Sequence, residues 1–249
     1  MISIKSQREL QLMKEAGRIV GLVHKKMAEV VRPGISTLEL DRIAEEVIRS
    51  NGATPSFKGY QGFPGSICTS INNMLVHGIP DHRILHDGDI ISIDVGACYK
   101  GYHGDSAWTY AVGNVSDEYL KLMQVTHDSL FEGLKQVKAG NKVGDIAHAI
   151  QTYVESYGYS LPIEYTGHGV GKHLHEDPAV PNVGRPHTLE MLKAGMCIAV
   201  EPMVFMGKPH CRTLTDGWGV VSKDGSWAAH YEHTVIVTED GYEITTKED

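Results

Sequence analysis

Two aspartates in residues 89–111 are placed where they could share a metal ion. This stretch has two apolar, β-branched arms around turn-forming residues and is typical of a β-hairpin. A turn centred on Tyr99 and Lys100 predicts that Asp94 lies directly opposite Asp105, with Cβ atoms roughly 5 Å apart. Two carboxylates that close repel each other unless a polyvalent cation lies between them. The alternatives are two exposed acids on a wet face, or a hairpin of different register.

Two glutamates and a histidine could supply further ligands. Glu201 ends an apolar strand and Glu232 begins another, where a buried carboxylate is unfavourable unless it is satisfied. His168 lies in GHGVGKHLHE, whose glycines argue against a helical HExxH zinc motif. Each residue alone could be a satisfied polar group of the core. As a set they are rich in carboxylates, which suits Mn²⁺, Fe²⁺ or Co²⁺, with zinc also possible. The set comprises Asp94, Asp105, His168, Glu201 and Glu232.

Composition narrows the class of protein. The 249 residues are 41% hydrophobic and 22% charged, as in an ordinary globular protein, and the net charge of −8 argues against a general nucleic-acid footprint. No signal-peptide core and no apolar run of about 18 residues appears, so we expect a cytoplasmic protein without DNA or membrane partners. The four cysteines are scattered without a CxxC pair, which favours free thiols.

The order of the expected elements indicates a mixed α/β protein. Apolar periodicity and turn residues predict helices over 7–31, 37–51, 117–138 and 143–157, and strands over 67–70, 90–95, 105–111, 196–204 and 232–238.

A faint internal repeat relates two parts of the chain. Gly34 and Gly140 lie 106 residues apart, and the strand that ends at Asp94 resembles the strand that ends at Glu201, 107 residues later. Chance similarity is the alternative. We expect a single domain, 1–249, with pseudo-symmetric halves of roughly 30–112 and 136–238 whose acids meet in the middle.

The motifs around these residues resemble a known family. The segments SIDVG, GYHGDSAWT, GHGVGKHLHE, AVEPM and YEHTVIV, together with VHGIP around His77, match in order and spacing those of the type I, bacterial-type methionine aminopeptidases. The resemblance covers essentially the whole chain, and no long insertion separates His175 from Glu201, as would be expected in type II enzymes. It implies the pita-bread α/β fold, with two pseudo-symmetric α-β halves around a central antiparallel sheet.

The resemblance implies a dinuclear metal site. Asp94 would chelate one divalent ion, Asp105 and Glu232 would bridge two ions, and His168 and Glu201 would complete the coordination of the second. The ions could be Co²⁺, Mn²⁺, Fe²⁺, Zn²⁺ or Ni²⁺.

The same resemblance implies catalytic roles for three residues. A water or hydroxide between the metals would be the nucleophile, and Glu201 would carry a proton to the leaving amine. His175 would stabilise the tetrahedral oxyanion. His77 would position the substrate or assist proton transfer, although a turn histidine bonded to backbone is the alternative.

By resemblance the substrate is the N-terminal methionine of nascent proteins and peptides with a small second residue. An apolar, aromatic pocket suits a thioether side chain, although the same aromatic residues could be ordinary core. We expect a monomer that contacts the ribosome transiently. The expected pocket residues are Tyr60, Phe63, Cys68 and Trp218, with Phe57 nearby.

Three other functions fit the same fold. A peptidase for Xaa-Pro bonds usually carries a large added N-terminal domain, for which Asp94 leaves no room. A binding protein that has lost catalysis would be expected to have lost metal ligands. Metal-free, creatinase-like hydrolysis would not need the five-ligand set.

Overall fold

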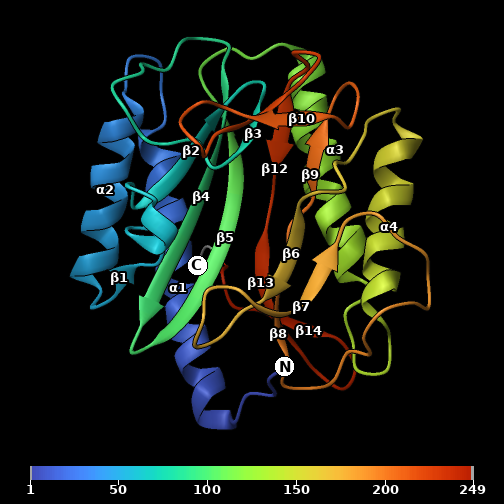
Figure 1. Ribbon diagram of the computed structural model, residues 1–249. Helices are drawn as coiled ribbons and strands as arrows, with labels where there is room; N and C mark the ends of the chain where they lie inside the picture. The colour runs from blue at the N-terminus through green and yellow to red at the C-terminus, as the bar shows by residue number, and fades with distance from the viewer. Residues whose placement is uncertain (1, 248–249) are drawn as a thin grey trace.

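Four α-helices lie on the two flanks of the described part of the chain. The computed structural model describes residues 2–247, with α1 and α2 on one side and α3 and α4 on the other (Figure 1). Ser6 caps the first helix in a capping box with Glu9. No helix among the described residues is long and apolar enough to cross a membrane. The helices are α1 (Gln7–Val30), α2 (Thr37–Ser50), α3 (Asp117–Leu134) and α4 (Val143–Ser156), with a 3₁₀ turn at Tyr60–Gly62.

The predicted end of the third helix at Lys138 is wrong. Helix α3 ends at Leu134, and the N–H of Gln136 bonds to the carbonyl of Gly133 in a tighter turn. The apolar pattern nevertheless continues, because Val137 is fully buried in the core after the backbone has left the helix. At this position the apolar spacing correctly indicated a buried residue but not a helical one.

The strands form antiparallel sheets between the two helix pairs. A four-stranded sheet contains β1, β2, β4 and β5, and a five-stranded sheet has the order β14-β13-β8-β6-β7. One smaller sheet pairs β12 with β9, and another has the order β10-β11-β3. The strands are β1 (Thr54–Pro55), β2 (Ile67–Ile71), β3 (Met74–Val76), β4 (Ile90–Tyr99), β5 (Tyr102–Ala111), β6 (Thr166–Gly169), β7 (Glu176–Pro181), β8 (Cys197–Val200), β9 (Met203–Phe205), β10 (Cys211–Thr213), β11 (Val220–Ser222), β12 (Ala228–His230), β13 (His233–Val237) and β14 (Tyr242–Ile244).

Each helix pair covers its own apolar core. Side chains of α1 and α2 pack with β4, and those of α3 and α4 pack with β8 and β13. Helices α2 and α4 each span 14 residues. Their first residues, Thr37 and Val143, keep the interval of 106 residues noted in the sequence.

The hairpin forms, but its predicted register is wrong. Asp94 lies opposite Ala107, and Asp105 lies opposite Gly96. The turn is made by Lys100 and Gly101, whose φ angles of 48° and 82° are those of the two-residue turn that best matches strand twist. Because the error shifts the pairing by two residues, both aspartates stay on one face as diagonal neighbours.

The expected strand over 196–204 is interrupted at the site. Strand β8 ends at Val200 and β9 begins at Met203, with Glu201 and Pro202 between them. Antiparallel pairing with the later chain continues on both sides of this gap, since Val200 pairs with His233 and Met203 with His230. In this register Glu201 is placed opposite Glu232.

Hydrogen bonds between distant segments bring the hairpin to these glutamates. The N–H of Glu232 donates to the carbonyl of Ala107 at 2.8 Å. The hydroxyl of Thr234 donates to the carbonyl of Asp105 at 2.8 Å, and the N–H of Asp105 lies 3.1 Å from the same hydroxyl oxygen. Strand β5 of one half is thereby joined to β13 of the other, next to both acids.

Candidate metal centre and active site

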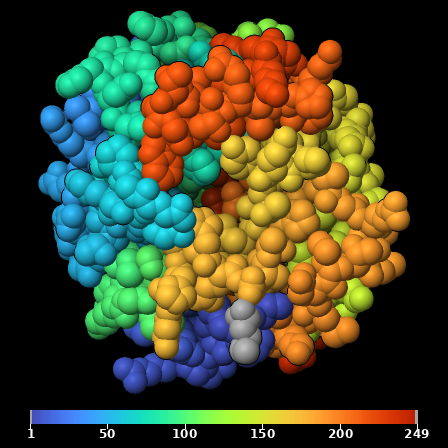
Figure 2. Space-filling view, viewed as in Figure 1, coloured from blue at the N-terminus to red at the C-terminus, as the bar shows by residue number. Residues whose placement is uncertain are grey.

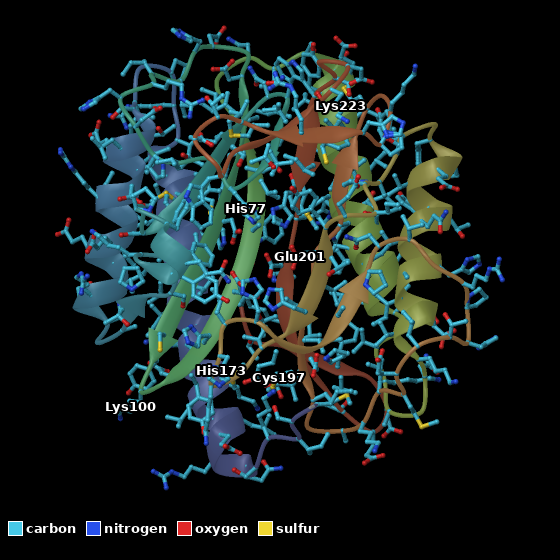
Figure 3. All side chains as sticks on the ribbon, in the orientation of Figure 1. His77, Lys100, His173, Cys197, Glu201 and Lys223 are labelled. Atoms are coloured by element: carbon cyan, nitrogen blue, oxygen red, sulfur yellow. The ribbon has the colours of Figure 1, made fainter. Side chains whose placement is uncertain are left out.

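A central cavity of about 420 Å³ lies between the two halves. Figure 2 shows it as a hollow in the middle of one face, with red atoms from the C-terminal part of the chain visible at its base. In Figure 3, Glu201 and His77 both lie near the middle of the molecule. The structure brings every sequence-predicted site residue to this cavity: Phe57, Tyr60, Phe63, Cys68, His77, Asp94, Asp105, His168, His175, Glu201, Trp218 and Glu232.

The carboxylates are buried and incompletely satisfied. Asp105 and Glu232 are only 4% and 2% exposed. One oxygen of each, and one of Asp94, has no hydrogen-bond partner among the described residues. Buried carboxylate oxygens without partners are strongly unfavourable. The three oxygens without partners at one cavity therefore indicate a binding site for a cation.

Burial and mutual repulsion shift the ionisation of these acids. Burial raises the pKa of Asp94 to about 7, and the charge of Glu201 adds to the shift. Burial also raises the pKa values of Asp105, Glu201 and Glu232 well above their usual range. A divalent cation would reverse this effect by stabilising the charged forms.

A histidine faces the same carboxylates. Nε2 of His168 lies 3.6 Å from Oδ2 of Asp105 and 3.5 Å from Oε1 of Glu201. Its Nδ1 lies 2.9 Å from the carbonyl of Gly169, which holds the ring and fits a proton on Nδ1. Burial lowers the pKa of His168 to about 4, so the imidazole is neutral and can act as a ligand.

The donor atoms fit divalent metal ions. Asp105, His168 and Glu232 offer ligand atoms that lie within 4.8 Å of one another, and so do Glu201, His230 and Glu232. Glu232 belongs to both groups, as a bridging carboxylate would. Carboxylate oxygens with few imidazoles suit the middle and later first-row dications.

Chelator-treated protein is expected to lose stability as pH rises from about 6.5 to 8. The folded-state pKa values of Asp94, Asp105, Glu201 and Glu232 exceed their unfolded values. The folded protein therefore binds more protons, and its free energy of unfolding falls as pH rises. Below pH 6.5 the buried histidines have the opposite effect. Their pKa values are lowered in the folded protein, so they make the free energy of unfolding rise with pH. Urea unfolding at several pH values measures the slope. Added Co²⁺ should flatten it, whereas stability that rises with pH after chelation would contradict this account.

Two further histidines lie beside this cluster. Nδ1 of His175 is 2.9 Å from the hydroxyl of Tyr60, and its ring centroid lies 4.2 Å from that of His168. His77 has a φ of 62°, an uncommon conformation for a residue with a side chain, and its ring contacts Tyr165 edge-on at 6.0 Å. Both imidazoles are therefore held at the cavity by specific neighbours.

One end of the cavity is apolar. Phe57, Phe63, Cys68 and Leu174 form a small buried cluster there. The ring of Phe63 meets that of Trp218 edge-on, with centroids 5.0 Å apart. A flexible apolar side chain, including a thioether, fits such surroundings.

Sequence reasoning missed eight residues that also line the cavity, among them His230, Tyr165, Leu174 and Met203. A signal for His230 existed, because it precedes Glu232 by two residues and so shares its face in an extended segment. Tyr165, Leu174 and Met203 carry no chemistry that singles them out in a sequence.

Known proteins similar in sequence to this chain are metallopeptidases, which agrees with a metal-binding site. Residues 11–239 match metallopeptidase family M24. The chain is 56% identical to methionine aminopeptidase 1 of Bacillus subtilis, covering 99% of this chain and 100% of that protein. It is 42% identical to methionine aminopeptidase of Escherichia coli, covering 98% and 94%.

Solved structures show the same fold. Methionine aminopeptidase from Thermotoga maritima superposes with a TM-score of 0.98 at 42% identity over all of both chains. Prolidase from Pyrococcus furiosus, at 23% identity, shares the fold with a TM-score of 0.81, and the match covers 99% of this chain and 66% of that one. The expected pita-bread fold is therefore confirmed. With its buried carboxylate and histidine cluster, this chain belongs to metallopeptidase family M24 and, within it, to the type I methionine aminopeptidases.

Proposed function

We propose that this metalloaminopeptidase removes the N-terminal methionine from nascent proteins and peptides whose second residue is small. The observation that carries the proposal is the cluster of unsatisfied buried carboxylates beside an apolar aromatic pocket in one cavity. The cluster supplies the hydrolytic end of the site, and the pocket supplies a place for the methionine side chain.

Asp94, Asp105, His168, Glu201 and Glu232 would hold two divalent ions. When bound, the ions would polarise the scissile carbonyl and lower the pKa of a bound water molecule. Support for a shared site comes from Glu232, which takes part in both groups of potential ligands. The identity of the ions is left to experiment among Co²⁺, Mn²⁺, Fe²⁺, Zn²⁺ and Ni²⁺.

Three side chains would handle the proton and the developing charge. Glu201 would take a proton from the attacking water and pass it to the leaving amine, because its carboxylate lies at the centre of the cluster and its pKa is raised by burial. His175 would donate to the oxyanion through Nε2, since Tyr60 engages its Nδ1. His77, which also lines the cavity, would position the peptide.

We further propose that the enzyme acts as a monomer in the cytoplasm, with its two halves forming one catalytic domain, and contacts the ribosome transiently. Hydrogen bonds of β5 with Glu232 and Thr234 support the single domain, because the site is built from both halves. The ribosome is proposed from the substrate, since nascent chains emerge there.

A panel of four tripeptides tests the substrate. Methionine release is expected from Met-Ala-Ser, with far slower release from Met-Phe-Ser and Leu-Ala-Ser and none from Ala-Pro-Ala. Equal turnover of Met-Ala-Ser and Met-Phe-Ser would contradict the size limit at the second residue. Preferred cleavage of Ala-Pro-Ala would instead support an Xaa-Pro peptidase.

Replacing Phe63 by alanine is expected to lower kcat/KM for Met-Ala-Ser by about tenfold or more. The variant loses a buried ring that packs against Trp218 and would contact the thioether. A loss of about 1.4 kcal/mol of apolar contact with the substrate corresponds to a tenfold fall in kcat/KM. Glu164→Ala is the matched control, because Glu164 is an exposed residue at the same cavity. Steady-state kinetics of the two folded variants give kcat/KM for Met-Ala-Ser. Equal values of kcat/KM in the two variants would contradict a contact between Phe63 and the methionine side chain.

A further inference from the structure

Among the described residues, His230 is the one imidazole outside the expected five-ligand set that faces the buried carboxylates at the same range as His168. Its side chain is almost fully buried, and Nε2 has no hydrogen-bond partner in the described part of the chain. That atom lies 3.6 Å from Oε2 of Glu201 and 3.7 Å from Oε2 of Glu232. A buried ring nitrogen without a partner, directed at two acids, needs an explanation.

These separations are too long for hydrogen bonds. A ring N–H bonded to a carboxylate lies about 2.7–3.2 Å from the oxygen. Two atoms that bind one ion at about 2.1 Å each are instead separated by roughly 3–3.5 Å, because they occupy neighbouring corners of its coordination polyhedron. The distances of His230 are close to the second range.

His168 provides an internal comparison. Its Nε2 stands 3.5 Å and 3.6 Å from carboxylate oxygens of Glu201 and Asp105. His230 stands at 3.6 Å and 3.7 Å from those of Glu201 and Glu232. The two histidines thus approach the cluster at nearly the same range and share Glu201.

The backbone holds His230 in this position. Its N–H donates to the hydroxyl oxygen of Thr109 at 3.0 Å, and the same hydroxyl donates to its carbonyl at 2.9 Å. Strand pairing with Met203 fixes the register. Because His230 and Glu232 are two residues apart in an extended segment, their side chains share a face. His233, of opposite parity, turns its ring to Thr246 instead.

We propose that His230 is an additional metal ligand, placing a second imidazole on the ion that Glu201 and Glu232 hold. The inference rests on the proposed metal-dependent function. A second nitrogen makes the site more favourable for Co²⁺, Ni²⁺ and Zn²⁺ relative to Mn²⁺, because imidazole is a better ligand for the later metals.

X-ray absorption of Co²⁺-loaded protein tests the proposal by counting imidazoles. With two equivalents bound, the wild-type protein should show two imidazoles per pair of ions. His230→Gln and His168→Gln should each remove one, and His233→Gln, the matched buried control, should remove none. Circular dichroism and thermal unfolding verify that each variant is folded. A wild-type count of one imidazole contradicts the proposal even where a variant fails to fold.

Calorimetric titration adds a second readout. His230→Gln should weaken Co²⁺ binding by about tenfold or more and Mn²⁺ binding by less. A wild-type count of one imidazole, lost entirely in His168→Gln, would overturn the ligand role of His230 and leave the proposed function intact. So would an unchanged count in His230→Gln, even with weaker binding. A wild-type protein that binds no Co²⁺ would overturn the proposed function itself.

Discussion

Glu201→Ala is expected to reduce turnover of Met-Ala-Ser by at least about a thousandfold while the protein stays folded. A positioned general base contributes typically 10²–10⁴-fold, and this carboxylate is also an expected metal ligand. Removing it also deletes a buried charge that repels Asp94. The metal-free variant should therefore be no less stable than the wild type above pH 7. Single-turnover assays at saturating metal measure the loss.

Two controls separate the roles of Glu201. Glu201→Gln keeps the shape and one oxygen ligand but cannot accept a proton, so it should be nearly as inactive as Glu201→Ala while binding metal more tightly than it. Glu164→Ala removes an exposed acid from the same cavity and should retain activity. Near-normal turnover in either variant of Glu201 would exclude it as the proton carrier.

Asp105→Asn is expected to abolish activity and to weaken the binding of both ions, whereas Asp94→Asn should weaken the binding of one. The difference follows from the expected bridging role of Asp105, which is 4% exposed and faces His168. Elemental analysis after dialysis gives the number of ions per chain, and calorimetry gives their affinities.

Stability provides the control for this comparison. Without metal, Asp105→Asn removes a buried carboxylate whose pKa is raised by burial and by Asp94, so the metal-free variant should resist urea better than the wild type at pH 8. A variant that still binds two ions tightly would contradict the bridging role, and the urea measurement shows whether it is folded.

The hairpin illustrates what a sequence can predict about a site. Side chains alternate along each strand, so Asp94 and Asp105 share a face only when the register is correct or wrong by an even number of residues. The register depends on which two residues form the turn. Lys100 has a positive φ, which is uncommon for lysine, so its residue type did not indicate the position of the turn. The prediction therefore failed by two residues along the strand but kept the correct face.

Glu201 was noticeable because an acid after a buried apolar strand is unfavourable on its own. Its position opposite Glu232 was not predictable from either segment, since it depends on pairing between β8 and β13 and on the interruption at Pro202. His230 escaped notice because β12 is a short strand without marked periodicity. Its spacing of two residues from Glu232 was a local signal for a shared face, and pairing with Met203 fixes the register.

The presence and the starts of the helices were predicted well, but the end of α3 was not. The starts at Gln7 and Thr37 follow from capping serines, which are local signals. The end of α3 at Leu134 depends on where the following loop must turn to bury Val137, which is a tertiary effect. The resemblance to a known family supplied the overall fold, which composition and periodicity alone left as mixed α/β.

Dependence on added metal tests the central claim most directly. The pure protein is incubated with Met-Ala-Ser and EDTA, freed of chelator, and assayed again with Mn²⁺, Fe²⁺, Co²⁺, Ni²⁺ or Zn²⁺. The buried, unsatisfied carboxylates predict complete loss of methionine release with EDTA and recovery with at least one of these ions. Methionine release that continues at full rate in EDTA, from protein shown by elemental analysis to be free of metal, would contradict the account.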